Sequence, residues 1–389
     1  MSNITRDFSD ELLSRLNQGA PFLQVVMGPR QVGKTTGVLA LQEKWKGRFF
    51  YASADSPSPP NHEWIREQWL AARAHGENAL LALDEIQKIT GWSEIIKQLF
   101  DEERRRKDRL SVVLLGSASW GVQKGLSESL TGRFELLRVS HWSLNECQKA
   151  FGWKLDQFLK FGGYPAPAIL VDEPERWQQF IRDSILEPML SRDILALRAV
   201  SKPALLRQTL ELALRHPAQE ISLQKILGQL QDSGNSTTIR GYLELLEAGF
   251  VIKTLTKFST RPLSTKSSSP KIIPLCGALM HAFENPSRID TDTAWKGRVF
   301  EAVIGATLAR CFPKVSYWRD GRYEVDFVVE DDSRLFAIEV KSSSEGRLTG
   351  LTEFKKRFKN TISIVLNYES GEKFLAAEDP AEVIRSSLV

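Results

Sequence analysis

The residues with the most specific chemistry form the segment GPRQVGKT, Gly28–Thr35. Its spacing fits the phosphate-binding pattern G-x-x-x-x-G-K-[ST], in which glycines let backbone N–H groups curl around phosphates. Lys34 is expected to reach the β and γ oxygens, and the Thr35 hydroxyl to help hold Mg²⁺. An apolar strand, Phe22–Met27, is predicted before this loop and a helix, Thr36–Trp45, after it. This order of strand, loop and helix predicts that the segment binds ATP. The alternative is a glycine turn that binds no nucleotide.

A second chemical element is the run NALLALDEIQK, in which the apolar strand Ala79–Leu83 ends in Asp84 and Glu85. The run resembles the acidic strand of P-loop ATPases. That resemblance implies that Asp84 helps to position Mg²⁺ and that Glu85 polarises the attacking water, so hydrolysis is expected. The residues expected to line the nucleotide and its Mg²⁺ are Gly28, Pro29, Gln31, Gly33, Lys34, Thr35, Thr36 and Asp84.

Two further features follow in the same part of the chain. The apolar strand LSVVLLGSAS ends in Ser117 and Ser119, which are placed where a sensor of the γ-phosphate would lie. Arg133 precedes a predicted strand, Glu135–Val139. In AAA+ ATPases, which this arrangement resembles, such an arginine reaches the neighbouring subunit's nucleotide, so the resemblance implies a homo-oligomer, plausibly a hexameric ring, with Arg133 as arginine finger. The alternative is an arginine with an intramolecular role.

Composition limits the class of protein. With 389 residues, 42% hydrophobic and 26% charged, the chain is expected to be globular with roughly two to four domains. No run approaches the about 18 to 20 apolar residues of a membrane span, and no signal core is seen at the start, so a cytoplasmic location without membrane contact is expected. Cys147, Cys276 and Cys311 are scattered and fit core thiols. The basic runs Glu103–Arg109 and Lys355–Lys359 could contact phosphates or be solvated helix faces.

The middle of the chain is predicted to be helical. Helices are expected at Ala204–Arg215 and Ser222–Leu230, and a third starts near Thr237, Thr238 and Arg240. A strand or hairpin, FVIKTLTKF, follows, so the natural interpretation is a winged-helix module that contacts DNA. Acidic residues on the third helix keep a structural or protein-binding role open. Arg261–Lys271, rich in Ser, Pro and Lys, is expected to be a mobile loop or strand connection outside the packed core.

The C-terminal part carries a second constellation. Glu301 lies on a predicted helix, Asp326 lies within EVDFVV, and Glu339 and Lys341 lie within AIEVKSS, where alternation puts both on one face. The polar turn EDDSR suits two adjacent antiparallel strands. The arrangement resembles the PD-(D/E)XK nuclease core, which implies that Asp326, Glu339 and Glu301 bind Mg²⁺ and that Lys341 orients water or neutralises phosphate charge. An active nuclease, an inactive nucleic-acid-binding relative and a chance acidic pair of strands remain open.

Taken in order, GPRQVGKT, LDEIQKITGW, GSAS, LTGRFE, FGGYPAP, YLELLEAGFVIK and EVDF…IEVKSS resemble a widespread prokaryotic family of AAA+-type ATPases with a C-terminal domain of unknown function. This predicts a multidomain α/β protein. The expected parts are a P-loop NTPase domain with a central parallel sheet at 1–145, a helical lid at 146–200, a winged helix at 201–262, a linker at 263–284 and a restriction-endonuclease-like α/β domain at 285–389. The expected function is ATP hydrolysis coupled to binding, remodelling or cleavage of DNA. The alternative is a nucleotide-dependent regulatory switch whose C-terminal half cuts nothing.

Overall fold

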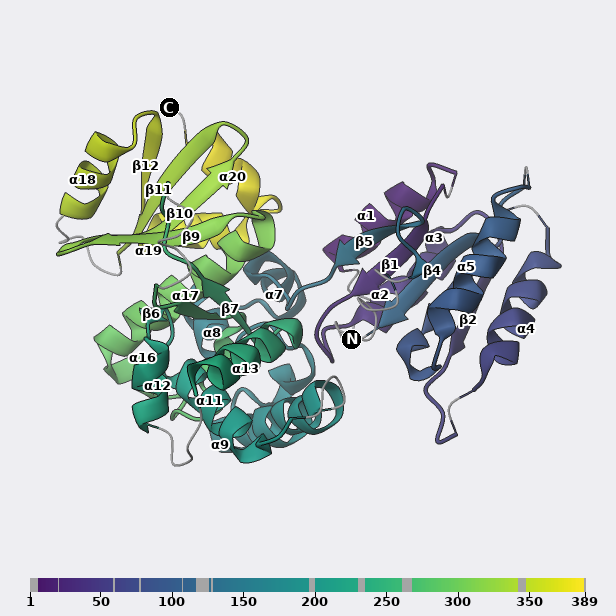
Figure 1. The fold of residues 1–389 in the computed structure, drawn as a ribbon, viewed down its shortest axis with the longest axis horizontal. Coiled ribbons are helices and arrows are strands. Elements are labelled where there is room, and N and C mark those ends of the chain that lie inside the picture. The colour runs from purple at the N-terminus through teal and green to yellow at the C-terminus, as the bar shows by residue number, and fades with distance from the viewer. Residues whose placement is uncertain are drawn as a thin grey trace. The chain divides into compact units, whose positions relative to one another are not determined.

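The computed structural model describes residues 6–19, 21–58, 60–76, 78–106, 108–116, 126, 129–195, 200–229, 235–260, 268–341 and 348–387. The chain divides into two compact units, Met1–Ser140 and His141–Val389 (Figure 1). Ser117 and Ser119 lie outside the described residues. Among the helices that the structure describes, none has the length and apolar character that a membrane span requires.

The first unit is built on a five-stranded parallel sheet with strand order β2-β3-β4-β1-β5. Its strands are β1 (Leu23–Met27), β2 (Phe49–Ser53), β3 (Leu80–Asp84), β4 (Ser111–Gly116) and β5 (Phe134–Arg138). Every residue of β1, β3 and β4 is buried, as expected of parallel strands that helices cover on both faces. The predicted central parallel sheet is confirmed. Because the strands are parallel, the ends of β1 and β3 meet at one edge.

Helices of the first unit surround this sheet. They are α1 (Asp7–Leu16), α2 (Lys34–Leu39), α3 (Leu41–Lys44), α4 (His62–Arg73) and α5 (Trp92–Glu103), with a 3-10 turn, η1 (Ile86–Lys88). The helix predicted at Thr36–Trp45 is interrupted at Ala40, which separates α2 from α3. The side chain of Asn61 caps α4 by accepting from the amides of Glu63 and Trp64, and α4 and α5 lie side by side (Figure 1).

The second unit begins with helices and a small antiparallel sheet. The elements are α7 (Leu144–Phe151), α8 (Leu155–Phe161), η2 (Ala166–Leu170), α9 (Pro174–Phe180), η3 (Ile181–Leu186), η4 (Met189–Ile194), α11 (Pro203–Arg215), β6 (Gln219–Glu220), α12 (Leu223–Gln229), α13 (Ser236–Ala248), β7 (Ile252–Leu255) and β8 (Lys271–Pro274). The sheet order is β6-β8-β7. Three helices and a hairpin thus occur in the predicted order, while the winged-helix assignment stays a prediction.

The assignment of Lys271 to a polar connection is wrong. Lys271 is the first residue of β8, where it pairs with Glu220 of β6 and Leu255 of β7, and it is only 5% exposed. The residues before Lys271 are rich in Ser, Pro and Lys, which indicates a polar segment. Local polarity does not determine which distant residues a lysine contacts.

A mixed sheet with order β12-β11-β10-β9 forms the last part of the chain. Its elements are α15 (Gly277–Met280), α16 (Arg288–Thr291), α17 (Thr293–Cys311), β9 (Val315–Asp320), β10 (Tyr323–Asp331), β11 (Arg334–Val340), α18 (Thr349–Arg357), β12 (Thr361–Leu366), α19 (Tyr368–Ala376) and α20 (Pro380–Ser386). Strands β10 and β11 pair antiparallel, which confirms the predicted pair of strands. Trp318, Val328 and Phe354 belong to the core between this sheet and α18.

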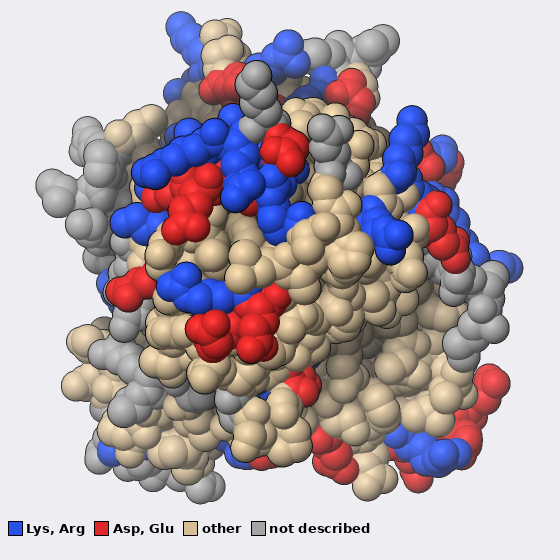
Figure 2. All heavy atoms as spheres, turned by 90° about the vertical axis from the view of Figure 1, so that its right-hand side faces the viewer, with Lys and Arg blue, Asp and Glu red and all other residues tan. Residues whose placement is uncertain are grey.

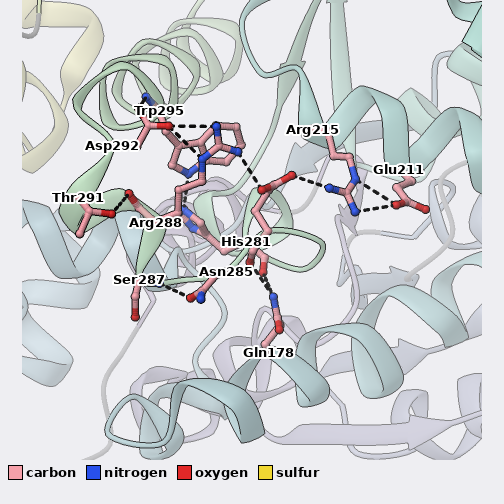
Figure 3. A network of polar contacts seen from close by, with 11 residues as sticks. Gln178, Glu211, Arg215, His281, Asn285, Ser287, Arg288, Thr291, Asp292 and Trp295 are labelled. Atoms are coloured by element: carbon pink, nitrogen blue, oxygen red, sulfur yellow. Dashed lines mark hydrogen bonds and ion pairs between the residues drawn. The ribbon is translucent and has the colours of Figure 1, made fainter.

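A polar network ties α9 and α11 to the segment before α17 (Figure 3). Glu284 accepts from Arg215 at 2.6 Å and from Arg288 at 2.8 Å. Nε2 of the fully buried His281 accepts from the indole N–H of Trp295 at 3.1 Å. Burial disfavours the charged imidazolium and lowers the pKa of His281 to about 4. The network is structural: it fixes where α17 begins.

Candidate functional site

The phosphate loop has the backbone that its glycines predict. Gly33 and Gln31 have left-handed φ values of 85° and 58°, so the chain curls between β1 and α2. The Lys34 ammonium is buried and donates to the carbonyl oxygens of Gly28 at 3.0 Å and Pro29 at 2.6 Å. Lys34 therefore lies across the loop. A phosphate bound by the loop would accept stronger hydrogen bonds from the Lys34 ammonium than these carbonyl oxygens do.

Close approach explains why Gly28 is glycine. A Cβ at this position would lie 2.0 Å from the carbonyl oxygen of Val139, which follows β5. The amide of Val139 in turn donates to the carbonyl of Met27 at 2.8 Å. The first residue of the loop is thus held against the end of β5 by backbone contacts alone.

Asp84 lies at the end of β3 and receives three donors. The hydroxyl of Thr35 donates to Asp84 Oδ2 at 2.6 Å, and the hydroxyl of Tyr51 donates to the same oxygen at 2.9 Å. The amide of Glu85 donates to Oδ1 at 2.8 Å. The two residues that the sequence assigned to Mg²⁺ are therefore in direct contact in the structure. A hydroxyl and a carboxylate side by side are a donor set that suits Mg²⁺.

Glu85 follows with a left-handed backbone, φ 52°, which turns the chain sharply after the strand. The amide nitrogen of Gln87 donates to Glu85 Oε2 at 2.5 Å. Such strain in a residue other than glycine is commonest at functional sites, where it fixes the direction of a side chain. Gln87 is thus a positioning residue for Glu85, and no sequence motif points to it.

Tyr51 is another residue that no motif identifies. It lies on β2, next to β3, and is 38% exposed. Burial and the neighbouring Asp84 charge raise its pKa to about 12, so the phenol stays protonated and remains a hydrogen-bond donor. The only sequence signal is an aromatic residue in a strand beside the acidic strand, and such residues are common in sheets.

Arg133 lies at the opposite edge of the sheet, immediately before the amino end of β5. Its guanidinium donates to both carboxylate oxygens of Asp101 on α5, at 2.7 Å and 2.9 Å. This hydrogen-bonded pair lowers the pKa of Asp101 and raises that of Arg133. Because the loop follows the carboxyl end of parallel β1, Arg133 lies at the far end of the sheet from its own phosphate loop.

Arg6, before α1, joins the loop to the end of the first unit. Its buried side chain donates to the carbonyl of Val32 in the phosphate loop and, at 3.2 Å, to the carbonyl of Ser140. Ser9 of α1 donates to the carbonyl of Gly37 at 3.0 Å. The loop and α2 are therefore braced from outside by a segment that carries no recognisable motif.

Two acids of the run Glu103–Arg109 pair with an arginine of the first unit. Arg73 of α4 pairs with Glu103 at 3.1 Å and Asp108 at 2.7 Å, so acids within the run Glu103–Arg109 bind a helix of the same unit. Figure 2 shows Lys and Arg side chains interspersed with Asp and Glu over the face that it draws. The acids of the run are thus paired, while Arg104, Arg105 and Arg106 are exposed.

The C-terminal constellation comes together around buried charges. Glu301 is on α17, Asp326 is on β10, and Glu339 and Lys341 are at the end of β11. Asp326 Oδ2 accepts from the Val340 amide at 2.8 Å, and the Lys341 ammonium donates to Glu339 Oε1 at 2.6 Å. Burial, and then the Asp326 charge, raise the pKa of Glu339 to about 7. The predicted residues thus share one site.

Lys271 is also at this site. Its ammonium donates to Glu301 Oε1 at 2.5 Å and lies 3.7 Å from Asp326 Oδ1. Burial raises the pKa of Glu301 to about 8, although Lys271 opposes the rise. Burial alone would lower the pKa of Lys271, but the charges of Glu301 and Asp326 outweigh it and raise that pKa.

This arrangement does not fit the predicted Mg²⁺. Within the described ranges, no group of three or more His, Cys, Asp or Glu side chains is placed to hold a metal ion. An ammonium lies between Glu301 and Asp326, and the second oxygen of Asp326 is taken by a backbone amide. Lys271 compensates for the charges of Glu301 and Asp326, and the predicted metal site stays a prediction.

Comparison with protein families matches three consecutive parts of the chain. Residues 21–148 match a family described as an AAA domain. Residues 152–287 match a domain of unknown function (DUF8612), and residues 296–379 match another (DUF4143). The boundary between the first two matches lies close to the division of the structure into units at Ser140.

Relatives exist in bacteria and archaea. The uncharacterised protein Rv2008c of Mycobacterium tuberculosis is 27% identical over 87% of this chain and 74% of its own. The uncharacterised protein MJ1544 of Methanocaldococcus jannaschii is 21% identical over 93% of this chain and 86% of its own. A solved structure of the Thermotoga maritima RuvB Holliday junction branch migration motor is 14% identical, with a TM-score of 0.34 over 64% of this chain and 89% of that chain. That likeness is too loose to carry an argument. The family matches and the sheet together show that the chain contains an AAA-type, P-loop ATPase-like domain followed by two domains of unknown function.

Proposed function

We propose that this protein hydrolyses ATP at the phosphate loop of its first unit. The observation that carries the proposal is the 2.6 Å hydrogen bond from the Thr35 hydroxyl to Asp84, with the buried Lys34 on the loop and Glu85 next in sequence. These are the parts that phosphoryl transfer to water requires: a phosphate cradle, a cation site and a carboxylate for the nucleophile.

Each residue has a definite task in this reaction. Backbone amides between Gly28 and Gly33 and the Lys34 ammonium bind the phosphates. Thr35 and Asp84 would hold Mg²⁺, which when bound neutralises charge on the β and γ phosphates. Glu85, aimed by the hydrogen bond from Gln87, accepts a proton from the attacking water.

The position of Arg133 favours an assembly of several subunits. Arg133 lies at the N-terminal ends of the parallel strands, whereas the nucleotide site of the same chain lies at their C-terminal ends. An arginine in this position acts on a nucleotide only if the nucleotide belongs to a neighbour. We therefore propose a homo-oligomer, such as a hexameric ring, in which Arg133 completes the next subunit's site.

We propose that the second unit binds a nucleic acid, with DNA as the first candidate. ATP binding and hydrolysis in the first unit would then move the second unit. The helices α11, α12 and α13 with the β7–β8 hairpin have the order of a winged helix, which supports contact with nucleic acid. The lysine within the carboxylate cluster favours binding without cleavage. The proposal is thus an ATP-dependent remodelling factor or switch, with strand cutting as the competing outcome.

One experiment tests the reaction and separates these outcomes. Phosphate release is measured with Mg²⁺, with excess chelator, and with single-stranded, duplex or branched DNA or RNA; the same samples are run on denaturing gels. We expect Mg²⁺-dependent hydrolysis that a nucleic acid changes, and intact strands. Absence of hydrolysis in every sample refutes the ATPase proposal, whereas metal-dependent cutting refutes the binding-only role of the second unit.

A further inference from the structure

The side chains of Glu301, Asp326 and Glu339 form an acidic cluster in the second unit, and the positively charged Lys271 lies against two of them. The Lys271 side chain is 7% exposed, and its ammonium donates to Glu301 Oε1 at 2.5 Å and to the backbone carbonyl of Asp326 at 3.2 Å. It also lies 4.7 Å from the centre of the Phe327 ring. The ammonium is therefore held by a carboxylate, a carbonyl and an aromatic face, and little of the lysine reaches solvent.

Counting charges shows what the lysine does. The cluster contains the carboxylates of Glu301, Asp326 and Glu339, and Lys341 compensates for Glu339 through a 2.6 Å contact. Lys271 lies between Glu301 and Asp326, 2.5 Å from one and 3.7 Å from the other. Buried carboxylates without a cation are costly, because they lose hydration without gaining a partner. Without this ammonium, Glu301 and Asp326 must take up a proton or another cation.

A second observation points to a cation-binding role for the cluster. Glu339 is 5% exposed, and its Oε2 atom is buried without a hydrogen-bond partner, one of few such side-chain atoms within the described ranges. A carboxylate oxygen in this state retains its capacity to bind a cation. The cluster therefore offers one open oxygen beside the two acids that Lys271 occupies.

The lysine comes from a different sheet than the acids. Lys271 begins β8, whose neighbours are β6 and β7, while Asp326 and Glu339 lie on β10 and β11. The pairing of β8 with two strands fixes the lysine backbone, so its position does not depend on the acids alone. The β6-β8-β7 sheet thus supplies the ammonium that compensates for the acids near the other sheet.

We infer that Lys271 is the resident cation of this cluster, occupying the place of a divalent metal, and that removal of its ammonium converts Glu301, Asp326 and Glu339 into a divalent-metal site. The inference is independent of ATP hydrolysis, because it concerns the other unit. It explains why two carboxylates face one ammonium, and it predicts that Lys271 alone determines whether this site binds a metal ion.

The test uses Mn²⁺ as the probe and the full chain without nucleotide. Wild type, Asp326→Asn, Lys271→Met, Lys271→Met/Asp326→Asn and the control Lys253→Met are compared by thermal melting and by calorimetric titration. Lys253 lies on the neighbouring strand β7, where it is half exposed and pairs with Glu247 at 3.2 Å, so its replacement leaves the cluster intact.

We expect Lys271→Met to melt several degrees lower without metal and to recover with millimolar Mn²⁺, while wild type and Lys253→Met respond weakly and equally. The added Asp326→Asn change should abolish the recovery, which separates this site from any binding at the phosphate loop. If Lys271→Met does not fold, Lys271→Gln, which keeps a hydrogen-bond donor, carries the same comparison. The inference is overturned if wild type binds Mn²⁺ with an affinity that Asp326→Asn abolishes, or if neither Lys271 variant gains metal binding over wild type.

Discussion

Replacing Arg133 by alanine separates a role in catalysis from a role in folding. The bidentate contact with Asp101, at 2.7 Å and 2.9 Å, joins side chains that are 24% and 35% exposed. Solvent screens a pair of this kind, so its loss should cost about 0.2–1 kcal/mol and lower the melting temperature by only a few degrees. An arginine finger is worth about 10³–10⁵ in turnover, or roughly 4–7 kcal/mol of the barrier.

The two roles therefore differ by orders of magnitude in one assay. We predict that Arg133→Ala binds ATP normally but loses at least about a hundredfold in hydrolysis, and that Asp101→Ala, which breaks the same pair from the other side, stays within a few-fold of wild type. Mixing Arg133→Ala with Glu85→Gln subunits should restore part of the activity, because some interfaces then pair an intact arginine with an intact site. Equal losses in both single variants, in step with their melting temperatures, would refute the trans role.

Three further outcomes follow from particular contacts. Lys34→Ala should weaken ATP binding roughly 30-fold or more, as measured by calorimetry, because it truncates the buried cation that we propose binds phosphate. Gly28→Ala should lose about 1–3 kcal/mol of stability and weaken ATP binding, because its Cβ would lie 2.0 Å from the Val139 carbonyl. Gly241→Ala, with open space around it inside α13, should melt no lower than wild type. The free energy of unfolding should fall between about pH 6.5 and pH 4 by up to roughly 3 kcal/mol from His281 alone: its folded pKa of about 4 lies below the unfolded value, so acid protonates the unfolded chain first. Urea titrations of wild type and His281→Gln at both ends of this range should show a smaller fall for the variant; equal falls would contradict the assignment.

Sequence reasoning succeeded where chemistry is local in the chain. The phosphate loop, its flanking strand and the acids at the end of β3 are each set by a few consecutive residues, and in the structure the Thr35 hydroxyl donates to Asp84. The pair β10–β11 was likewise predictable from alternation and a polar turn. In these cases the pattern that specifies the element also carries the functional residue.

It failed where a residue acts through a distant partner. Lys271 follows a Ser- and Pro-rich run, and nothing in those letters indicates a contact with Glu301 or Asp326 on other elements. Tyr51 reaches Asp84 only because β2 is the neighbour of β3, an order that the sequence does not specify. A lone lysine or tyrosine has many ordinary roles, so its function emerges only when the sheets are assembled.

Turnover and ATP binding by the Glu85→Gln variant test the central proposal most directly. The amide keeps the shape of the side chain beside Gln87 but cannot take a proton from water. The proposed mechanism predicts that this variant binds Mg²⁺-ATP with wild-type affinity and releases phosphate at least about a hundredfold more slowly. Hydrolysis by Glu85→Gln at the wild-type rate would contradict the mechanism and with it the role of this carboxylate in the site.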